Sequence, residues 1–294
     1  MFYRKRIAIA LLASFDGELE KLRFQKLLFL FTQIQSRASY HFIPYKYGCY
    51  SFQANADMIA MTKTGMIDDT HSSWILKSGQ HSDEALTKED RIVLNRIEHD
   101  FGTMDTSELV RYTYLHFPFY AINSLIAHQV LSKTEIAEIS SQRPRDATAA
   151  LFTIGYEGRS LEEFVNILIA HNIKMLCDVR KNAFSMKYGF SKGTLQIACD
   201  NVGIDYIHIP DLGIVSSDRK NLVTKADYEN LFARYGQTVL RDTVPLQKEL
   251  ALKVQSAGRA ALMCFEADPS MCHRSHCASA LVANTQLNMP VVHL

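Results

Sequence analysis

Four short, mainly apolar runs in the second half of the chain constrain its fold more than any other feature. They lie at residues 151–156, 174–179, 205–209 and 259–265, with amphipathic helical patterns between them. Strands that are apolar on both faces are typical of a parallel sheet covered by helices on both sides. The sequence therefore predicts a Rossmann-like three-layer α/β domain, with a mostly parallel sheet, over residues 148–294.

The segments between and after these runs are predicted to be helices, followed by one more short strand. Ser160 and Glu163 have the spacing of a capping box, so a helix is expected to begin there. Gly258 is expected to close another helix. The predicted helices lie at residues 160–172, 193–202, 225–235, 245–257 and 275–283, and the final strand lies at 290–293.

Polar side chains follow each predicted strand at its carboxyl end. In an open parallel sheet, ligands bind beyond these ends, at one edge of the sheet. We therefore predict a site built from residues that are distant in the sequence. The side chains are Tyr156 and Glu157 after the first strand, Asp178 and Arg180 after the second, His208 after the third, and Cys264 and Glu266 after the fourth.

The turn after the fourth strand is the densest part of this predicted site. Within eleven residues it brings together Cys264, Glu266, Cys272, His273 and Arg274, just before a predicted helix. Burying so many ionisable groups would cost several kcal/mol unless they were paired, hydrated or functional. The free backbone N–H groups at the start of that helix also favour an anion such as phosphate.

Each group has a predicted role. Arg180 and Arg274 are expected to hold phosphate, because a guanidinium binds anions through two parallel hydrogen bonds. Asp178 and Glu266 are expected to serve as base and acid, and Tyr156 is expected to stack on a nucleobase. Without a phosphate, Asp178 and Arg180 would form an ion pair that locks the sheet edge, and this alternative stays open. The predicted substrate-binding set also includes Glu157, Ser185 and His208.

The cysteines of the turn have three interpretations. Cys272, at a helix N-terminus beside His273, would have a lowered pKa and could be a catalytic nucleophile. Alternatively, Cys264 and Cys272 form a regulatory disulfide, or both are packed thiols that support the turn. A metal site made of Cys272, His273, His276 and Cys277 is not expected, because adjacent ligands on one turn cannot all face one ion. No metal and no cofactor are therefore predicted.

The same strand-end residues carry a family resemblance. The motifs are Thr-Ile-Gly-Tyr-Glu-Gly at 153–158, Cys-Asp-Val-Arg at 177–180 with Ser185, His-Ile-Pro-Asp-Leu-Gly at 208–213, and Cys-Phe-Glu at 264–266 with Cys-His-Arg at 272–274. Residues 151–294 resemble the domain of unknown function 488 family. The resemblance implies a Rossmann-like fold and a polar site. It implies no settled reaction, although such domains are suspected of acting on nucleic acids or nucleotides.

The first half of the chain, residues 1–145, is predicted to be a separate, mainly helical domain. Helices are expected at residues 5–14, 18–35 and 52–64, with short strands near 66–67 and 74–76. Asp16-Gly17 is expected to separate the first two helices, and Gly65 to end the third. A polar spacer at 78–83 precedes a helix that begins at Thr87 and runs to about Phe101.

This order resembles a winged-helix domain of the Panacea, antitoxin-like or phage-associated group. The motifs are Leu-Arg-Phe-Gln-Lys-Leu-Leu at 22–28, Pro-Tyr-Lys-Tyr-Gly at 44–48 with Ser51, and Gly-Met-Ile at 65–67. The resemblance implies toxin neutralisation, protein contacts and sometimes DNA binding. Tyr45-Lys46-Tyr47 could stack on bases and meet a phosphate, or its tyrosines could cap the core of the domain.

Composition limits the partners and the compartment. The net charge is +1, so nucleic acid could be bound only by a local patch. The six scattered cysteines favour a reducing cytoplasm. A basic and apolar start imitates a secretory signal, but its helical pattern continues into residues 19–28, and no run reaches the ~20 apolar residues of a membrane span.

Together these features predict a cytoplasmic two-domain protein that hydrolyses a phosphodiester or N-glycosidic bond in nucleic acid or a nucleotide, in DNA processing or genome defence. The alternative is a sensor that binds a nucleotide or modified base without turnover and signals through a winged-helix DNA- or protein-binding module. A third interpretation is a thiol-based redox switch. The N-terminal domain is also a candidate surface for a homodimer or a partner protein.

Overall fold

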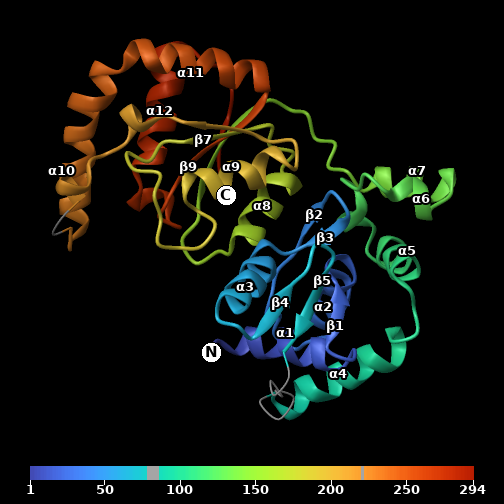
Figure 1. Ribbon diagram of the computed structural model, residues 1–294. Helices are drawn as coiled ribbons and strands as arrows, with labels where there is room; N and C mark the ends of the chain where they lie inside the picture. The colour runs from blue at the N-terminus through green and yellow to red at the C-terminus, as the bar shows by residue number, and fades with distance from the viewer. Residues whose placement is uncertain (78–85, 220–221) are drawn as a thin grey trace. The chain divides into compact units, whose positions relative to one another are not determined.

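The computed structural model describes residues 1–77, 86–219 and 222–294, and the chain divides into two compact units, Met1–Arg143 and Pro144–Leu294 (Figure 1). Each unit has its own hydrophobic core. The polar spacer predicted at residues 78–83 lies outside the described residues.

The C-terminal unit contains a five-stranded sheet in which every strand pair is parallel. The strand order is β10-β6-β9-β7-β8, so β9 lies between two strands that precede it in the sequence. Every residue of β6 and of β9 is buried. The strands are β6 (Ala150–Gly155), β7 (Met175–Asp178), β8 (Asp205–His208), β9 (Arg259–Cys264) and β10 (Val291–His293).

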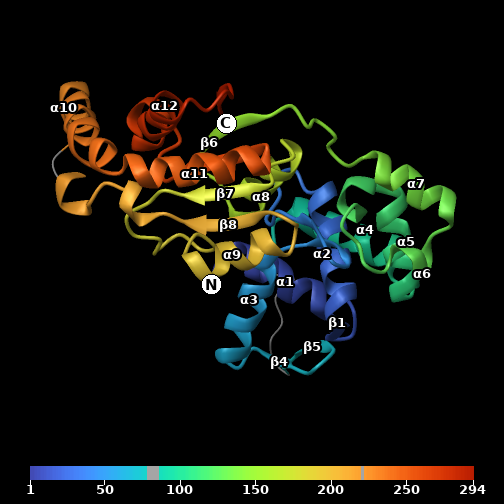
Figure 2. The same ribbon diagram turned by 90° about the horizontal axis from the view of Figure 1, so that it is seen from above.

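Helices cover both faces of this sheet, as the apolar strands predict. On one face α11 packs against α12, and both contact β9, whereas on the other face α9 packs against α8 and β8 (Figure 2). The predicted Rossmann-like α/β fold is therefore confirmed. The helices are α8 (Leu161–Ala170), α9 (Lys192–Asp200), α10 (Lys225–Tyr235), α11 (Val244–Ala257) and α12 (His273–Thr285).

Local sequence signals set several of these helix ends. Both hydrogen bonds of the predicted capping box form: Ser160 N donates to Glu163 Oε2 at 2.7 Å, and Glu163 N donates to Ser160 Oγ at 3.2 Å. Gly258 follows α11 with φ +72°, a conformation that glycine adopts without strain. Helix α12 begins two residues earlier than predicted, which places His273 and Arg274 in its first turn and Cys272 at its N-cap.

The N-terminal unit is mainly helical and carries two small antiparallel sheets. The larger one has the order β1-β5-β4, and β2 and β3 form a hairpin. Its elements are α1 (Tyr3–Ala13), β1 (Glu18–Glu20), α2 (Lys21–Ile34), β2 (Ile43–Tyr45), β3 (Gly48–Tyr50), α3 (Phe52–Lys63), β4 (Ile67–Asp69), β5 (Ser73–Leu76), α4 (Lys88–Phe101), α5 (Thr106–His116), α6 (Ala127–Val130) and α7 (Lys133–Ser141).

Two segments near the start of this unit bear on the predictions made for it. The second helix was predicted to start at Glu18, but residues 18–20 form β1 and pair with β5, so the helix starts at Lys21. The signal-like segment at the start of the chain is the buried part of α1, with residues 7–12 at most 1% exposed. No helix among the described residues is long and apolar enough to span a membrane. The winged-helix resemblance stays a prediction.

Candidate functional site at the carboxyl edge of the parallel sheet

The carboxyl ends of β6, β7 and β9 lie side by side, as predicted. In the sheet register Gly155 of β6 faces Cys264 of β9, and Asp178 of β7 faces Met263. Backbone hydrogen bonds continue past the strands, because Tyr156 N donates to Cys264 O at 3.3 Å. Chain reversals after three strands therefore bring the predicted side chains to one edge.

Asp178 and Arg180 form a buried bidentate ion pair. Arg180 Nε and NH2 donate to the two carboxylate oxygens at 2.8 and 2.5 Å, and Arg180 N donates at 3.1 Å. Tyr206 Oη donates the fourth hydrogen bond at 2.7 Å. Because Asp178 is 0% exposed and has four donors, the geometry favours the interpretation as a structural lock and gives no support to a role as base.

Burial and charge act in opposite directions on this network. Burial disfavours the charged guanidinium of Arg180, but its hydrogen bonds to Asp178 and the charge of that carboxylate outweigh burial and raise its pKa. Burial, together with the negative charge of Asp178, raises the pKa of Tyr206. Both shifts favour the protonated forms of Arg180 and Tyr206, which are the hydrogen-bond donors to Asp178.

Tyr156 is part of the same buried cluster. Its hydroxyl accepts a hydrogen bond from Arg180 NH1 at 3.0 Å, and its ring stacks on Phe190 with a centroid distance of 4.3 Å. The residue is only 4% exposed. The predicted stacking of Tyr156 on a nucleobase therefore has no support in this geometry.

Arg274 is fully buried and holds the turn after β9. Its NH1 and NH2 groups donate to the backbone oxygens of Glu266 and Ala267 at 2.5 and 3.0 Å. Its Nε has no hydrogen-bond partner among the described residues. These contacts orient the Glu266 segment, so the predicted role of Arg274 in holding phosphate stays a prediction that the contacts do not favour.

Glu266 lies at the border between the buried cluster and solvent. Its Oε1 forms an ion pair with Arg219 NH2, and the two side chains are 14% and 31% exposed. Its Oε2 lies 3.5 Å from Cys264 Sγ. Sequence analysis missed Arg219, because it lies in a short 3₁₀ segment, Ser216–Arg219, where no periodic pattern marks it.

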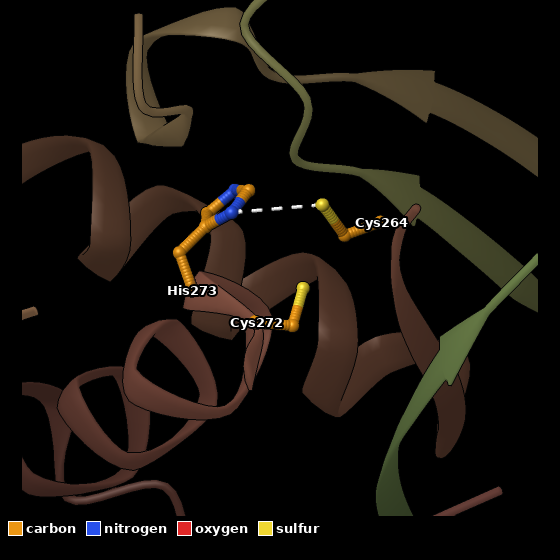
Figure 3. A group of neighbouring side chains, drawn as sticks. All are labelled: Cys264, Cys272 and His273. Carbon is orange, nitrogen blue, oxygen red and sulfur yellow. Dashed lines mark hydrogen bonds between the residues drawn. The ribbon is translucent and has the colours of Figure 1, made fainter. Parts of the chain in front are cut away.

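Cys264, Cys272 and His273 converge between β9 and α12 (Figure 3). His273 Nε2 lies 3.0 Å from the carbonyl oxygen of Val179, which accepts hydrogen bonds only. The proton of a neutral imidazole therefore sits on Nε2, and Nδ1 presents its lone pair. That Nδ1 lies 3.5 Å from Cys264 Sγ.

The two thiols differ in acidity, and the difference reverses the prediction. Burial raises the pKa of Cys272 to about 12. A hydrogen bond from Cys272 lowers the pKa of Cys264, and the positive charges of Arg219 and Arg274 add to this effect against burial. The prediction of a lowered pKa for Cys272 is therefore wrong, because this N-cap thiol is buried and donates to its neighbour. Both cysteines are free thiols and form no disulfide.

The remaining predicted site residues tie the loops of this edge together. Glu157 Oε2 accepts a hydrogen bond from Ala267 N at 2.9 Å. Ser185 Oγ accepts one from Lys187 N at 3.1 Å, and His208 Nε2 lies 2.9 Å from Arg180 O. Glu157 is exposed, whereas Ser185 and His208 are half-buried. They position the backbone around the cluster.

Large exposed apolar side chains and lysines occur in the loop after β7 and at the end of β9. Phe184 is 67% exposed, Met186 is 91% exposed, and Phe265 is 40% exposed. Lys187 donates to Tyr156 O at 2.9 Å, and Phe265 packs edge-on against the Tyr156 ring. These contacts place Lys187 and Phe265 beside the buried cluster, and Phe184 and Met186 are exposed in the loop that carries Lys187. We call these four residues the aromatic and basic rim.

The motifs at this edge agree with the comparison with protein families. Neither the search of curated proteins nor the search of solved structures returned a match to the chain. Residues 160–281, which include Asp178, Arg180, Glu266 and the turn 272–274, match the model of the family described as Domain of unknown function DUF488. The C-terminal unit is therefore similar to this family over residues 160–281.

Proposed function

We propose that the C-terminal unit is a hydrolase that acts on a nucleotide or on nucleic acid, with Glu266 as its general base. The observation that carries the proposal is the position of the Glu266 carboxylate, at the solvent border of the cluster formed by Cys264 and His273. Asp178 and Glu266 are the two predicted acid–base carboxylates. Asp178 is buried and its oxygens are occupied by hydrogen bonds, whereas the Glu266 side chain is partly exposed to solvent. A base must be within reach of the water that it activates.

Arg219 connects this base to an anionic substrate. Its guanidinium pairs with Glu266 and is 31% exposed, so a phosphate can compete for it. When a phosphate takes Arg219, the Glu266 carboxylate is released beside the bound substrate. Glu266 then accepts a proton from water, and the water oxygen bonds to phosphorus or to the sugar carbon. The bond from that atom to the leaving oxygen or base nitrogen breaks, and the leaving atom takes up the proton.

The aromatic and basic rim supports a nucleotide or nucleic acid as substrate. Exposed aromatic rings stack on bases at about 1–3 kcal/mol per base, and lysines meet the phosphates. Phe184 and Phe265 offer such rings, and Lys187 offers the charge. The net charge of +1 makes this local patch, and not a global field, the means of attraction.

For the N-terminal unit we propose a binding role in DNA processing or genome defence. The support is a cavity of about 440 Å³ whose lining includes Tyr45, Tyr47 and Trp74. Tyr47 is 51% exposed, whereas Tyr45 stacks on Tyr50 with a centroid distance of 4.8 Å. The substitution Lys46→Ala is expected to weaken duplex DNA binding by the full chain and to reduce its salt dependence. If the affinity for duplex DNA and its salt dependence were both unchanged, the unit would be expected to bind a protein partner instead.

The catalytic proposal is tested by incubating the full chain with modified and unmodified DNA, RNA and nucleotides, followed by mass spectrometry. We expect product from the wild type and a rate about 10²–10⁴-fold lower for Glu266→Gln, because a positioned base contributes that much. Asp268→Asn is the matched control. Asp268 is exposed in the same turn, and its Oδ1 accepts from Ser270 N at 2.8 Å, a bond that an amide oxygen can keep.

The outcomes separate the interpretations. If the Glu266→Gln variant were as active as the wild type, Glu266 would not be the general base. A ligand that raises the melting temperature but is recovered unchanged would instead identify the protein as a sensor.

A further inference from the structure

We propose that Cys264, Cys272 and His273 bind a zinc ion. Their Sγ, Sγ and Nδ1 atoms all lie within 4.8 Å of one another, and the three residues are 0%, 0% and 2% exposed. Cys264 ends β9, while Cys272 and His273 open α12, so two rigid elements supply the ligands (Figure 3).

The spacing of the ligand atoms fits a tetrahedral ion. With Zn–S near 2.3 Å and Zn–N near 2.0–2.1 Å, a tetrahedral angle separates the two ligands by about 3.5 Å. Cys264 Sγ and His273 Nδ1 are 3.5 Å apart. The separation of this pair therefore matches that of two ligands of one zinc ion.

The adjacency of Cys272 and His273 in the sequence does not prevent them from sharing an ion. Cys272 is the N-cap residue with extended backbone angles, φ −133° and ψ 135°, whereas His273 is the first helical residue. The change of backbone conformation turns both side chains toward Cys264. The metal site that the sequence analysis rejected also contained His276 and Cys277. In the structure the His276 ring packs on the Phe232 ring, with a centroid distance of 4.4 Å.

A second and independent observation concerns the far side of the imidazole. Histidines that bind metals usually donate their other ring N–H to a carboxylate or a backbone carbonyl, which fixes both the tautomer and the ring orientation. His273 Nε2 has this partner in Val179 O, at 3.0 Å, just after β7. The accepting carbonyl belongs to the segment after β7, not to β9 or α12. The hydrogen bond orients the imidazole so that the Nδ1 lone pair faces the two sulfur atoms.

The chemistry of the ligands selects the ion. Thiolate and imidazole are the ligands of zinc sites, whereas Mg²⁺ and Ca²⁺ prefer oxygen. Two thiolates balance the charge of a divalent ion, which offsets the cost of placing them in a buried site. Three protein ligands would leave one position for water, as at catalytic zinc sites. The Glu266 carboxylate is close to the ligand set, with Oε2 3.5 Å from Cys264 Sγ. Metal binding is measurable without turnover, so this inference does not rest on the proposed hydrolysis.

Metal content and cobalt substitution test the proposal on the full chain. The protein is purified under reducing conditions, its zinc is measured by elemental mass spectrometry, and the zinc is then removed with a chelator and replaced by Co²⁺. We expect one zinc ion per chain and, with cobalt, thiolate-to-metal charge-transfer bands together with the visible bands of tetrahedral cobalt. Substoichiometric zinc and a cobalt spectrum without thiolate bands would overturn the proposal.

Ligand variants locate the ion. Cys264→Ser and Cys272→Ser are expected to weaken metal affinity by more than the about 10–100-fold that loss of an outer hydrogen-bond partner costs. Cys199→Ser, which changes a buried thiol in α9, is the matched control and should keep wild-type affinity. Wild-type affinity in Cys272→Ser would overturn the assignment. If a variant does not fold, X-ray absorption of the zinc-loaded wild type decides: two sulfur neighbours support the site, and a shell of only nitrogen and oxygen refutes it.

Discussion

At the scale of single residues, burial decides which charged groups of the sheet edge hold the fold and which are available for chemistry. The sequence places Asp178, Arg180 and Arg274 in the site, and from their types all three could act on a substrate. In the structure Asp178 and Arg274 are 0% exposed and Arg180 is 6% exposed. Their hydrogen bonds go to one another, to the hydroxyls of Tyr156 and Tyr206, or to the backbone of neighbouring turns.

The Asp178 network makes a prediction about stability. Asp178→Ala leaves the buried guanidinium of Arg180 without its counter-charge, and removing one partner of a buried pair costs about 3–5 kcal/mol. Tyr206→Phe removes one neutral donor from the same charged carboxylate and should cost less, about 1.5–3 kcal/mol. Urea denaturation measures both free energies of unfolding. If Asp178→Ala were no less stable than Tyr206→Phe, the ion pair would not hold the sheet edge.

The loss of activity in Asp178→Ala would therefore report on folding as well as on chemistry. If all three residues acted on the substrate, alanine at Asp178, Glu266 or Arg274 would abolish activity and spare the fold. The contacts support that expectation only for Glu266, whose side chain lies at the solvent border. Near-ultraviolet circular dichroism of the three variants separates the two effects.

At the scale of elements, the end of β6 is shaped by the turn that carries Glu266. Gly155 is the last residue of β6, and a Cβ there would overlap the backbone oxygen of Glu266 and lie 2.6 Å from its carbonyl carbon. These are backbone atoms, which cannot move aside as a flexible side chain does. Glycine is therefore required for the close approach of the two segments.

Gly155→Ala is expected to destabilise the protein by at least the about 1–3 kcal/mol that overpacking costs, and to lower activity by displacing Glu266. Gly193→Ala is the control, because a Cβ there meets no described atom within 4 Å and the residue lies in α9. It should raise stability by up to about 1 kcal/mol. Thermal unfolding and the rate of product formation are measured for both. A Gly155→Ala protein with wild-type stability and rate would contradict the close approach.

The elements themselves were largely predictable, and the exceptions have physical causes. Mainly apolar runs identify β6, β7, β8 and β9, because helices cover both faces of the sheet. Strand β1 was missed because Glu18–Glu20 directly precede the helical pattern of α2 and were assigned to the first turn of that helix. The insertion of β9 between β6 and β7 could not be read from the sequence, because strand order depends on which neighbour each crossover connection reaches.

At the scale of the whole molecule, the change of pattern along the chain corresponds to two units with separate cores. Sequence reasoning located the site at the carboxyl edge because parallel strands share that edge. It did not assign the roles, because burial and pairing depend on packing between segments far apart in the chain. Arg219 meets Glu266 from a segment without a pattern, and Cys264 meets His273 across a turn.

Two cores and one metal site predict how the protein unfolds. Calorimetry of the full chain should show two transitions, and removal of zinc should lower the temperature of only one, because a ligand stabilises the folded unit that binds it. Cys272→Ser should shift the same transition and make it insensitive to the chelator. A single transition that moves as a whole would show that the two units unfold together.

The central claim is that the carboxyl end of β9 is a hydrolytic centre in which Glu266 activates water. The most direct measurement is turnover of the substrate identified by mass spectrometry, carried out in heavy-oxygen water. We expect the wild type to add one heavy oxygen to the product for each bond cleaved, and Glu266→Gln to form labelled product about 10²–10⁴-fold more slowly. Product without heavy oxygen, or a Glu266→Gln rate equal to that of the wild type, would contradict the claim.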